Sequence, residues 1–412
     1  MASDETQRPD LCIIGTDPVG LDLALAAAGL GYRVAIITAS TESPSPALIR
    51  ARAVGAALLA GTTHFLSPKS LEAGGVIVMP RFFALATGAT AEIPPIAEIE
   101  TIPVWDETSP PDPLLILGST AEAARLAEAA LRQGGRAMIA CYSAFPAGFD
   151  AETGARLRIH LQRAGVTFVE RARLAGRIVA RDAGFEWQNG TGSREAENDS
   201  LPFSHLALAT SLLPKLDGLE LEKADIRRAD GRLVLDDAFR TSNPRVFALG
   251  LASGEIGRHH GKTQIAAALS ALMLGKPRAP SPALYSRHVQ TEPGIAEIGL
   301  READIPTDQR ADYRYYRASF AEAGGGEGHV KALVGTNGAL RGVSIYGARA
   351  GELILPFQLA MQASVKLHDL ARLPVAAPGA GDALTQIARL ALRDRLKASR
   401  WLQLMRWLRV IR

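Results

Sequence analysis

The residues from Asp10 to Thr38 constrain the fold of this chain more than any other stretch. The short apolar run Leu11–Ile14 breaks at a glycine, a helical pattern rich in small residues follows, and a second apolar run ends at Thr38. Strand, glycine turn, helix and strand in this order predict a βαβ unit with a buried parallel sheet. In such units the glycines let the backbone approach a diphosphate, and the helix N-terminus supplies N–H donors. The stretch therefore predicts a dinucleotide-binding scaffold.

The glycine turn departs from the G-x-G-x-x-G pattern at the position that would face the diphosphate. Gly15 and Gly20 stand at the first and third positions, but Asp17 stands at the second. A carboxylate there would lie where the diphosphate is expected, and two anions repel strongly in a poorly hydrated site. The second strand is expected to end in an acidic residue that holds the ribose hydroxyls, yet it ends in Thr38. We therefore expect the scaffold to be present and dinucleotide binding at this turn to be weak or lost.

Length and charge limit the class of protein. The 412 residues exceed what one hydrophobic core serves, so two or three domains are expected, and 47% hydrophobic with 22% charged residues is usual for soluble α/β proteins. The net charge is +3, but residues 393–412 hold seven basic residues and one acid. The remaining body is mildly acidic, which argues against nucleic-acid binding. Two distant cysteines and no signal-peptide or membrane-spanning pattern favour a cytoplasmic location.

A second βαβ start follows at residues 114–140. Its turn reads GSTAEA, with Gly118 at the first position, Thr120 at the middle position and Ala123 as an acceptable third. A β-branched residue in the middle blocks the close approach of the backbone to a diphosphate. Between the two units, residues 47–60 are predicted as one Ala/Leu helix, and residues 103–113 as an extended linker.

The last part of the chain changes character at about residue 280. Residues 171–203 before it suggest an antiparallel meander with a turn near Asn189-Gly190. After it, the turn Asn337-Gly338 lies between two strong strand patterns and predicts a β-hairpin. Helices are predicted over 352–364 and 383–397, which makes this an α+β domain. The adjacent pair His259-His260 has no further ligand at metal spacing, so no metal site is predicted.

Taken in order, several segments resemble the pyridine nucleotide–disulfide oxidoreductases, in particular the mercuric-reductase-like and dihydrolipoamide-dehydrogenase-like flavoproteins. DLCIIGTDPVG resembles the first FAD loop, and ALATGATAEIPPI, with Thr87 and Gly88, resembles the ATG turn. LLILGSTAEAARLAE is similar to the NAD(P) loop, and TSNPRVFALGLASG, with Gly250, to the second FAD strand. TEPGIAEIGL resembles the entry to the dimerisation domain.

The resemblance implies an α/β fold with two Rossmann-like units, one FAD-type and one NAD(P)-type, and a C-terminal α+β dimerisation domain. It implies FAD and NAD(P) as cofactors, with NADH and NADPH both open, and a two-fold dimer. The expected boundaries are 1–112 with 204–280 for a shortened FAD-type domain, 113–203 for the NAD(P)-type domain, 281–392 for the dimerisation domain and 393–412 for a basic amphipathic tail.

The departures from the family fall on its chemical positions. The family's Cys-x4-Cys pair, on a helix after the first FAD unit, is absent. Leu251 stands where an Asp holds the flavin's ribityl and phosphate region. Ala377 stands at the position of the His that is the acid/base for the dithiol, and Asp382 only approximates the Glu that orients it. No residue is therefore assigned a catalytic role, and both cofactors are expected to bind weakly or not at all.

Three interpretations stay open. The first is a pseudoenzyme that has lost dithiol chemistry and works as a homodimer, or as a heterodimer with an active paralogue. The second is an FAD-dependent oxidoreductase that passes hydride from NAD(P)H to a small acceptor without a redox disulfide. The third is a protein that contacts the membrane surface through the basic tail, residues 393–412, predicted as an amphipathic helix with one apolar stripe.

Overall fold

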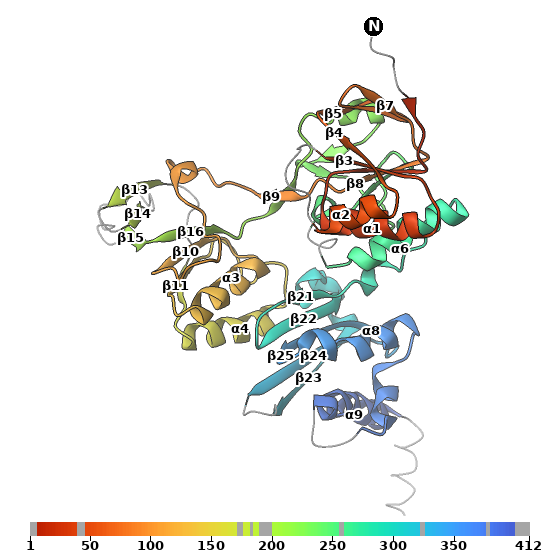
Figure 1. Cartoon of the computed structure of the whole chain (residues 1–412). Coiled ribbons are helices and arrows are strands. Elements are labelled where there is room, and N and C mark those ends of the chain that lie inside the picture. The colour runs from red at the N-terminus through yellow and green to blue at the C-terminus, as the bar shows by residue number, and fades with distance from the viewer. Residues whose placement is uncertain are drawn as a thin grey trace, which may run out of the picture. The chain divides into compact units, whose positions relative to one another are not determined.

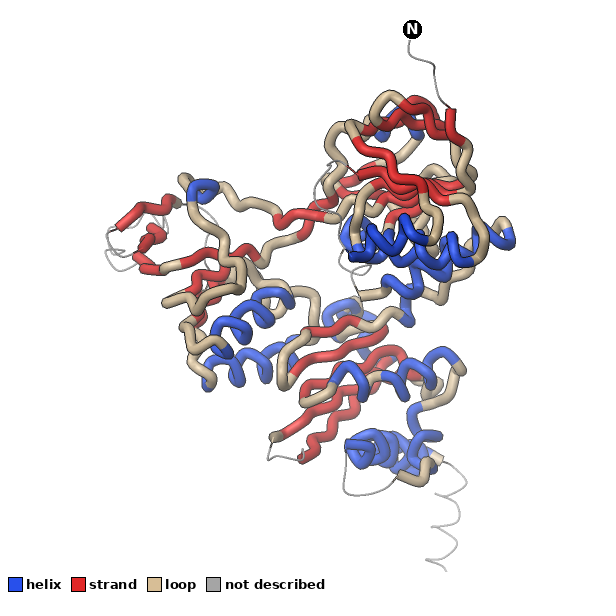
Figure 2. Tube along the Cα trace, viewed as in Figure 1, coloured by secondary structure: helices blue, strands red, loops and turns tan. Residues whose placement is uncertain are grey.

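The computed structural model describes residues 6–38, 46–170, 176–181, 184–188, 200–254, 259–321, 326–375 and 380–399. The chain divides into two compact units (Figures 1 and 2). The first consists of Met1–Glu92 with Ser211–Tyr285, and the second of Ile93–Thr210 with Ser286–Arg412.

The first unit is built on a parallel sheet. Its order is β20-β8-β2-β3-β4, and the strands are β2 (Leu11–Ile14), β3 (Val34–Thr38), β4 (Ala57–Ala60), β8 (Phe82–Leu85) and β20 (Val246–Ala248). The helices α1 (Pro18–Gly29), α2 (Pro46–Ala53) and α6 (Gly261–Leu274) pack on one face through a shared apolar core, as Figure 1 shows. The predicted strand, glycine turn, helix and strand of residues 10–38 are confirmed.

The other face of this sheet is covered by a smaller sheet and by loop residues. Its order is β1-β7-β6-β5, from β1 (Thr6–Gln7), β5 (Thr63–Ser67), β6 (Ser70–Ala73) and β7 (Val76–Val78). Leu71 and Val78 from these strands share a core with Cys12 and Ile14 of β2. Two short antiparallel pairs complete the unit: β9 (Ala89–Ala91) with β17 (Leu212–Pro214), and β18 (Arg228–Ala229) with β19 (Arg232–Leu233).

The predicted helix over residues 47–60 is wrong in its second half. Helix α2 ends at Ala53, and Ala57–Ala60 forms the edge strand β4, which pairs in parallel with β3. Gly55 separates the two with a φ of +92°, a conformation that glycine adopts without strain. A short Ala/Leu run suits either element, and here pairing with the open edge of β3 decided the outcome.

The second unit begins with another parallel sheet. Its order is β12-β11-β10-β16, from β10 (Leu114–Leu117), β11 (Ala137–Ala140), β12 (Thr167–Val169) and β16 (His205–Leu208), with helices α3 (Ala121–Arg132) and α4 (Ala151–Arg163). The predicted meander is confirmed as the antiparallel sheet β13 (Arg177–Arg181), β14 (Gly184–Gln188) and β15 (Ser200–Phe203). The turn predicted at Asn189-Gly190 lies outside the described residues.

An antiparallel sheet of order β21-β22-β25-β24-β23 closes the second unit. Its strands are β21 (Arg287–Val289), β22 (Gly294–Gly299), β23 (Tyr313–Ala321), β24 (Glu327–Gly335) and β25 (Leu340–Gly347), so the predicted Asn337-Gly338 hairpin is confirmed. The helix predicted over 352–364 is divided into α7 (Ala350–Leu353) and α8 (Leu355–Gln362), because Pro356 starts a new helix at its N-terminus. Helix α9 (Ala380–Ala398) includes the start of the predicted tail, and residues 400–412 lie outside the described part of the chain.

Alternation along the strands divides the closing sheet between two cores. Ile295 and Tyr346 pack against residues of α3 and α4, whereas their neighbours Ala296 and Ile345 share a core with α8 and α9. Successive side chains of a strand point to opposite faces, so one sheet serves both layers.

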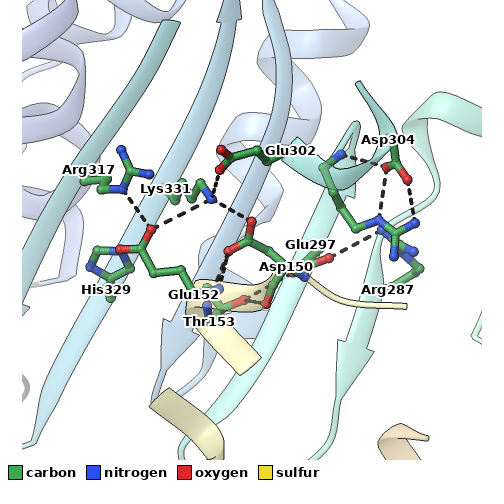
Figure 3. A network of polar contacts seen from close by, with 11 residues as sticks. Asp150, Glu152, Thr153, Arg287, Glu297, Glu302, Asp304, Arg317, His329 and Lys331 are labelled. Atoms are coloured by element: carbon green, nitrogen blue, oxygen red, sulfur yellow. Dashed lines mark hydrogen bonds and ion pairs between the residues drawn. The ribbon is translucent and has the colours of Figure 1, made fainter. Parts of the chain in front are cut away.

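A buried ionic network fixes α4 to this sheet (Figure 3). Asp150 caps α4, since its Oδ1 accepts the N–H of Glu152 at 3.0 Å, and its Oδ2 lies 2.7 Å from Nζ of Lys331 on β24. Lys331 also contacts Oε2 of Glu302 at 2.9 Å, and Glu297 on β22 accepts the N–H of Asp150 at 2.6 Å. Only 7% of Lys331 and 1% of Glu297 is exposed. Loss of one partner from such a network costs about 3–5 kcal/mol, because the remaining charge stays buried.

We expect the substitution Glu297→Gln to change the pH dependence of stability. Burial raises the pKa of Glu297, despite the opposing contribution of its hydrogen bond from the Asp150 N–H. An acid with a raised pKa in the folded state destabilises that state as pH rises from its ordinary pKa toward the raised one. Urea unfolding of the wild type and the variant between about pH 5 and pH 8 should therefore give a difference in free energy, variant minus wild type, that grows with pH.

Asp304→Asn is the matched control. The hydrogen bond from the Arg301 side chain lowers the pKa of Asp304, so its contribution is lost only below the usual range of a carboxyl group. The corresponding difference should stay constant over the same interval. All four tryptophans, Trp105, Trp187, Trp401 and Trp407, belong to the second unit, so tryptophan fluorescence reports its unfolding. A pH-independent difference for Glu297→Gln would contradict the assignment.

Candidate dinucleotide-binding turns

The first glycine turn has the backbone geometry that the sequence predicts. Gly15 follows β2 with a φ of +101°, and a Cβ on it would lie 2.2 Å from the Ala86 carbonyl oxygen at the end of β8. A Cβ on Gly20 would lie 2.4 Å from the Cβ of Ala86. Both glycines are thus required by the close approach of the turn and of α1 to β8, whether or not a ligand binds.

The carboxylate of Asp17 occupies the N-terminus of α1. Asp17 is the N-cap residue, and its Oδ1 accepts the N–H of Val19 at 3.0 Å. Its Oδ2 accepts the N–H of Leu251 at 3.4 Å, and a Cβ on Gly250 would lie 2.1 Å from Oδ1. The structure therefore brings together Asp17, Gly250 and Leu251, which are far apart in the sequence. The carboxylate lies at the helix end where an anionic ligand of such a turn is expected.

A buried glutamine, which the sequence analysis missed, supports the other side of this arrangement. Gln264 of α6 is fully buried, and its Oε1 accepts the N–H of Gly250 at 2.8 Å. Its Nε2 donates to Oγ of Ser253 at 2.7 Å, and that hydroxyl donates to the Gly250 carbonyl. These contacts hold the 3-10 turn Gly250–Ser253 against α6. The signal available in the sequence was a polar residue among the apolar residues that form α6.

Three further predicted residues lie at the carboxyl ends of β3 and β8. Thr38 ends β3 and pairs with Ala60 of β4. Gly88 follows β8 with a φ of +70°, and its carbonyl accepts the N–H of Lys215 at 3.1 Å. Thr87 directly precedes Gly88, and its buried Oγ1 has no hydrogen-bond partner within the described residues. A buried hydroxyl without a partner is the kind of group that a ligand oxygen satisfies.

In the second turn, the two hydroxyl side chains form hydrogen bonds with the backbone of neighbouring segments. Gly118, with a φ of +137°, would place a Cβ 2.1 Å from the Ala209 carbonyl oxygen. Thr120, at the middle position, donates its hydroxyl to that same carbonyl at 2.8 Å. Ser119 is fully buried and its Oγ accepts the N–H groups of Tyr142 and Ser143, while Ala123 is buried in α3. The Thr120 side chain is thus committed to the end of β16.

Of the two positions predicted to correspond to the family's acid/base pair, the structure describes one. Ala377 lies outside the described residues. Asp382 is a half-buried residue in the first turn of α9, and its backbone carbonyl accepts the hydroxyl of Thr385 at 3.0 Å. No contact links it to a titratable base in the part of α9 that is described.

The two cysteines are free and buried. Burial raises the pKa of the Cys12 thiol far above its ordinary value, and burial also raises the pKa of Cys141. Because the thiolate is the reactive form, this burial disfavours the reactive form of both cysteines. Within the described residues, no cluster of three His, Cys, Asp or Glu side chains could hold a metal ion. His260 instead precedes α6 and lies over the ring of Tyr285.

The comparisons with known proteins identify the class. The family model for pyridine nucleotide-disulphide oxidoreductases matches residues 82–271, and the model for the dimerisation domain of these enzymes matches residues 285–388. Together the two matches cover most of the chain, and the chain belongs to this family. Its α/β fold with a C-terminal dimerisation domain is that of the flavoprotein disulfide reductases.

Individual relatives have different activities. The chain is 26% identical over 337 residues to a mercuric reductase of Acidithiobacillus ferrooxidans, covering 76% of this chain and 59% of that protein. It is 26% identical to a dihydrolipoyl dehydrogenase of Thermus scotoductus and 27% identical to a glutathione reductase of Burkholderia cepacia, with 70% of each covered. The chain thus spans somewhat more than half the length of the mercuric reductases that it matches.

The fold likeness extends over nearly the whole chain. The Cu(II) complex of the HOCl-induced flavoprotein disulfide reductase RclA from Escherichia coli matches 93% of this chain with a TM-score of 0.76 at 20% identity.

In the described part of the chain, no helix is long and apolar enough to cross a membrane.

The residues at the first turn do not fit the diphosphate of FAD. The diphosphate would need the N–H donors of the α1 N-terminus, and the Asp17 carboxylate already accepts from Val19 there. Leu251 offers no carboxylate to the ribityl side, and its own N–H is used by Asp17. The buried Thr87 hydroxyl, by contrast, favours a ligand at this turn.

We expect Asp17→Ala to destabilise the first unit by about 1 kcal/mol, the typical cost of losing an N-cap side chain. Asp17→Asn should keep most of the stability, because the amide oxygen can still accept the N–H of Val19. Scanning calorimetry of the three proteins would measure the difference. Equal stability of Asp17→Ala and the wild type would show that the carboxylate does not cap α1.

Proposed function

We propose that this protein works without dithiol–disulfide exchange, as a non-catalytic or chemically altered family member that acts as a dimer. The observation that carries the proposal is the Asp17 carboxylate at the N-terminus of α1, bonded to the N–H groups of Val19 and Leu251. This internal anion takes the place of the external one, so FAD binding is weak or lost at this turn. The burial of both cysteines supports the same conclusion, because dithiol exchange needs an accessible thiolate.

The cofactor argument extends to the second turn by the same reasoning. Thr120 stands where a glycine would let the backbone meet the diphosphate of NAD(P), and its hydroxyl is bonded to Ala209. A β-branched side chain at this point keeps a ligand away from the turn. We therefore propose that binding of NADH and of NADPH is also weak or lost.

One observation favours a second candidate function. The buried Thr87 hydroxyl, unpaired among the described residues, adjoins the Gly15 turn, and Gly15, Gly20 and Gly250 are all retained. An oxidoreductase that holds FAD and passes hydride from NAD(P)H to a small acceptor, without a redox disulfide, would use such a hydroxyl. In such an oxidoreductase, the Asp17 side chain would have to move away from the N-terminus of α1 when FAD binds.

The exchange of the carboxylate between positions 17 and 251 provides the test. We expect wild-type protein to bind FAD at least about tenfold more weakly than the double variant Asp17→Gly with Leu251→Asp, since one recovered charge-assisted contact is worth that much. Equilibrium titration with FAD, followed by flavin fluorescence, measures both affinities. Asp22→Asn, which removes an exposed carboxylate of α1, is the charge control and should leave the affinity unchanged.

Wild-type protein that is purified with one bound FAD per chain would overturn the first proposal in favour of the second. Should neither the wild type nor the double variant bind FAD, the Asp17 carboxylate would not be the cause of the loss.

We propose that the dimer is formed by the domain of residues 285–388, either between two copies or with an active paralogue. Helix α8 carries two leucines on one side, Leu355 and Leu359, which are 53% and 65% exposed. Apolar side chains one helical turn apart form a surface suited to a partner.

We expect Leu355→Asp with Leu359→Asp to convert a dimer to a monomer, because two carboxylates would be buried at the contact. Val104→Asp, at an equally exposed apolar residue of the same unit outside α8, is the control and should leave the dimer intact. Light scattering at micromolar concentration reports the mass. A wild-type monomer, or equal masses for both variants, would contradict this proposal.

A further inference from the structure

A basic pocket of about 710 Å³ lies in the closing domain of the second unit. Its walls come from β23, from the turn between β24 and β25, from the 3-10 helix Leu367–Arg372 and from the last turns of α9. Its basic lining residues are Arg314, Lys366, Arg372 and Arg395, which approach from three different elements or loops, with His368 beside them. None of the described residues that line it is an Asp or a Glu.

These four cations differ from several other cations of the same unit. Arg125, Arg301, Arg317 and Lys331 each form an ion pair with a carboxylate at 2.9 Å or less. By contrast, no carboxylate of the described residues pairs with Arg314, Lys366, Arg372 or Arg395. Among the described residues, four cations without a carboxylate partner thus surround one cavity. Like charges gathered in this way destabilise the fold unless an anion compensates them.

A buried histidine lies beside one of the four cations. His368 is 6% exposed, and its Nε2 contacts the guanidinium of Arg395. Burial, and then the charge of Arg395, lower the pKa of His368, while Asp369 at 3.6 Å opposes this shift. A neutral imidazole beside a guanidinium orients the guanidinium without neutralising it.

Local structure accounts for only one of the four cations. Arg395 lies in the last turn of α9, where helix carbonyls favour a positive charge. Arg314 lies on β23, Lys366 precedes the 3-10 helix and Arg372 ends it. The dipole of α9 therefore does not explain why these three cations lie around the same pocket. The rest of the lining combines the polar turn Thr336–Gly338 with an apolar floor that includes Tyr316 and Ala391. A multiply charged head group with a less polar remainder suits such a lining.

We propose that this pocket binds a phosphate-bearing anion. Arginine side chains present planar N–H donors that match phosphate oxygens, and several of them around one cavity favour a group with more than one negative charge. Residues 400–412 contain four arginines and no Asp or Glu side chain, so their side chains offer no anion for this pocket. The phosphate comes either from a free phosphorylated small molecule or from a lipid head group.

Isothermal titration of the full-length protein with inorganic pyrophosphate tests the proposal. Binding should weaken as salt is added, and Arg314→Gln with Arg372→Gln should weaken it by at least about tenfold, the value of one lost charge-assisted hydrogen bond. Both residues are exposed, so their replacement leaves the core unchanged. The matched control, Arg132→Gln with Arg349→Gln, removes two arginines that are paired with Glu128 and Glu352 and should change the affinity less than about twofold.

Sedimentation with phosphatidylcholine vesicles, with or without phosphatidate, distinguishes the two sources. Binding to phosphatidate that depends on Arg314 and Arg372, without pyrophosphate binding, supports the site and identifies the lipid as the source. Pyrophosphate binding that depends on the same two residues, without vesicle binding, supports the site and a free ligand. If neither probe binds, or if both double variants bind like the wild type, the proposal is overturned.

Discussion

The hydrogen bonds from the N–H groups of Val19 and Leu251 to the carboxylate of Asp17 decide how the first unit is to be understood. A helix N-terminus with free donors attracts an anion, and in a dinucleotide-binding turn that anion is a diphosphate. Here a side chain of the turn meets this demand within the protein itself. The close packing of the Gly15 turn and of α1 against β8 requires the two glycines independently of any ligand.

The second unit shows two uses of the same types of charged side chain. Around Asp150, carboxylates and cations are buried together, and each lysine or arginine in the network has a partner. The alternation of β24 places His329 and Lys331 on the face that meets α4, while Val330 and Ala332 enter the opposite core. Around the basic pocket, four cations lie without an ion-paired carboxylate among the described residues. The first arrangement stabilises the contact between α4 and the sheet, and the second is the site at which we propose that an external anion binds.

Local patterns in the sequence predicted the elements whose signals are local. The apolar run, glycine and small-residue helix of residues 10–38 and the Asn337-Gly338 turn needed only neighbouring residues to be recognised. The helix predicted over residues 47–60 is wrong in its second half, because β4 forms only through pairing with β3. The contact of Asp17 with Leu251 spans 234 positions and that of Asp150 with Lys331 spans 181, so neither geometry follows from spacing. The basic pocket could not be predicted for the same reason, since its residues come from separate elements.

A crystal structure of the wild-type protein grown with excess FAD tests the central claim most directly. The account predicts an Asp17 carboxylate bonded to the N–H groups of Val19 and Leu251, with no diphosphate at the N-terminus of α1. Density for the FAD diphosphate at that helix end, with the Asp17 side chain turned away, would contradict it.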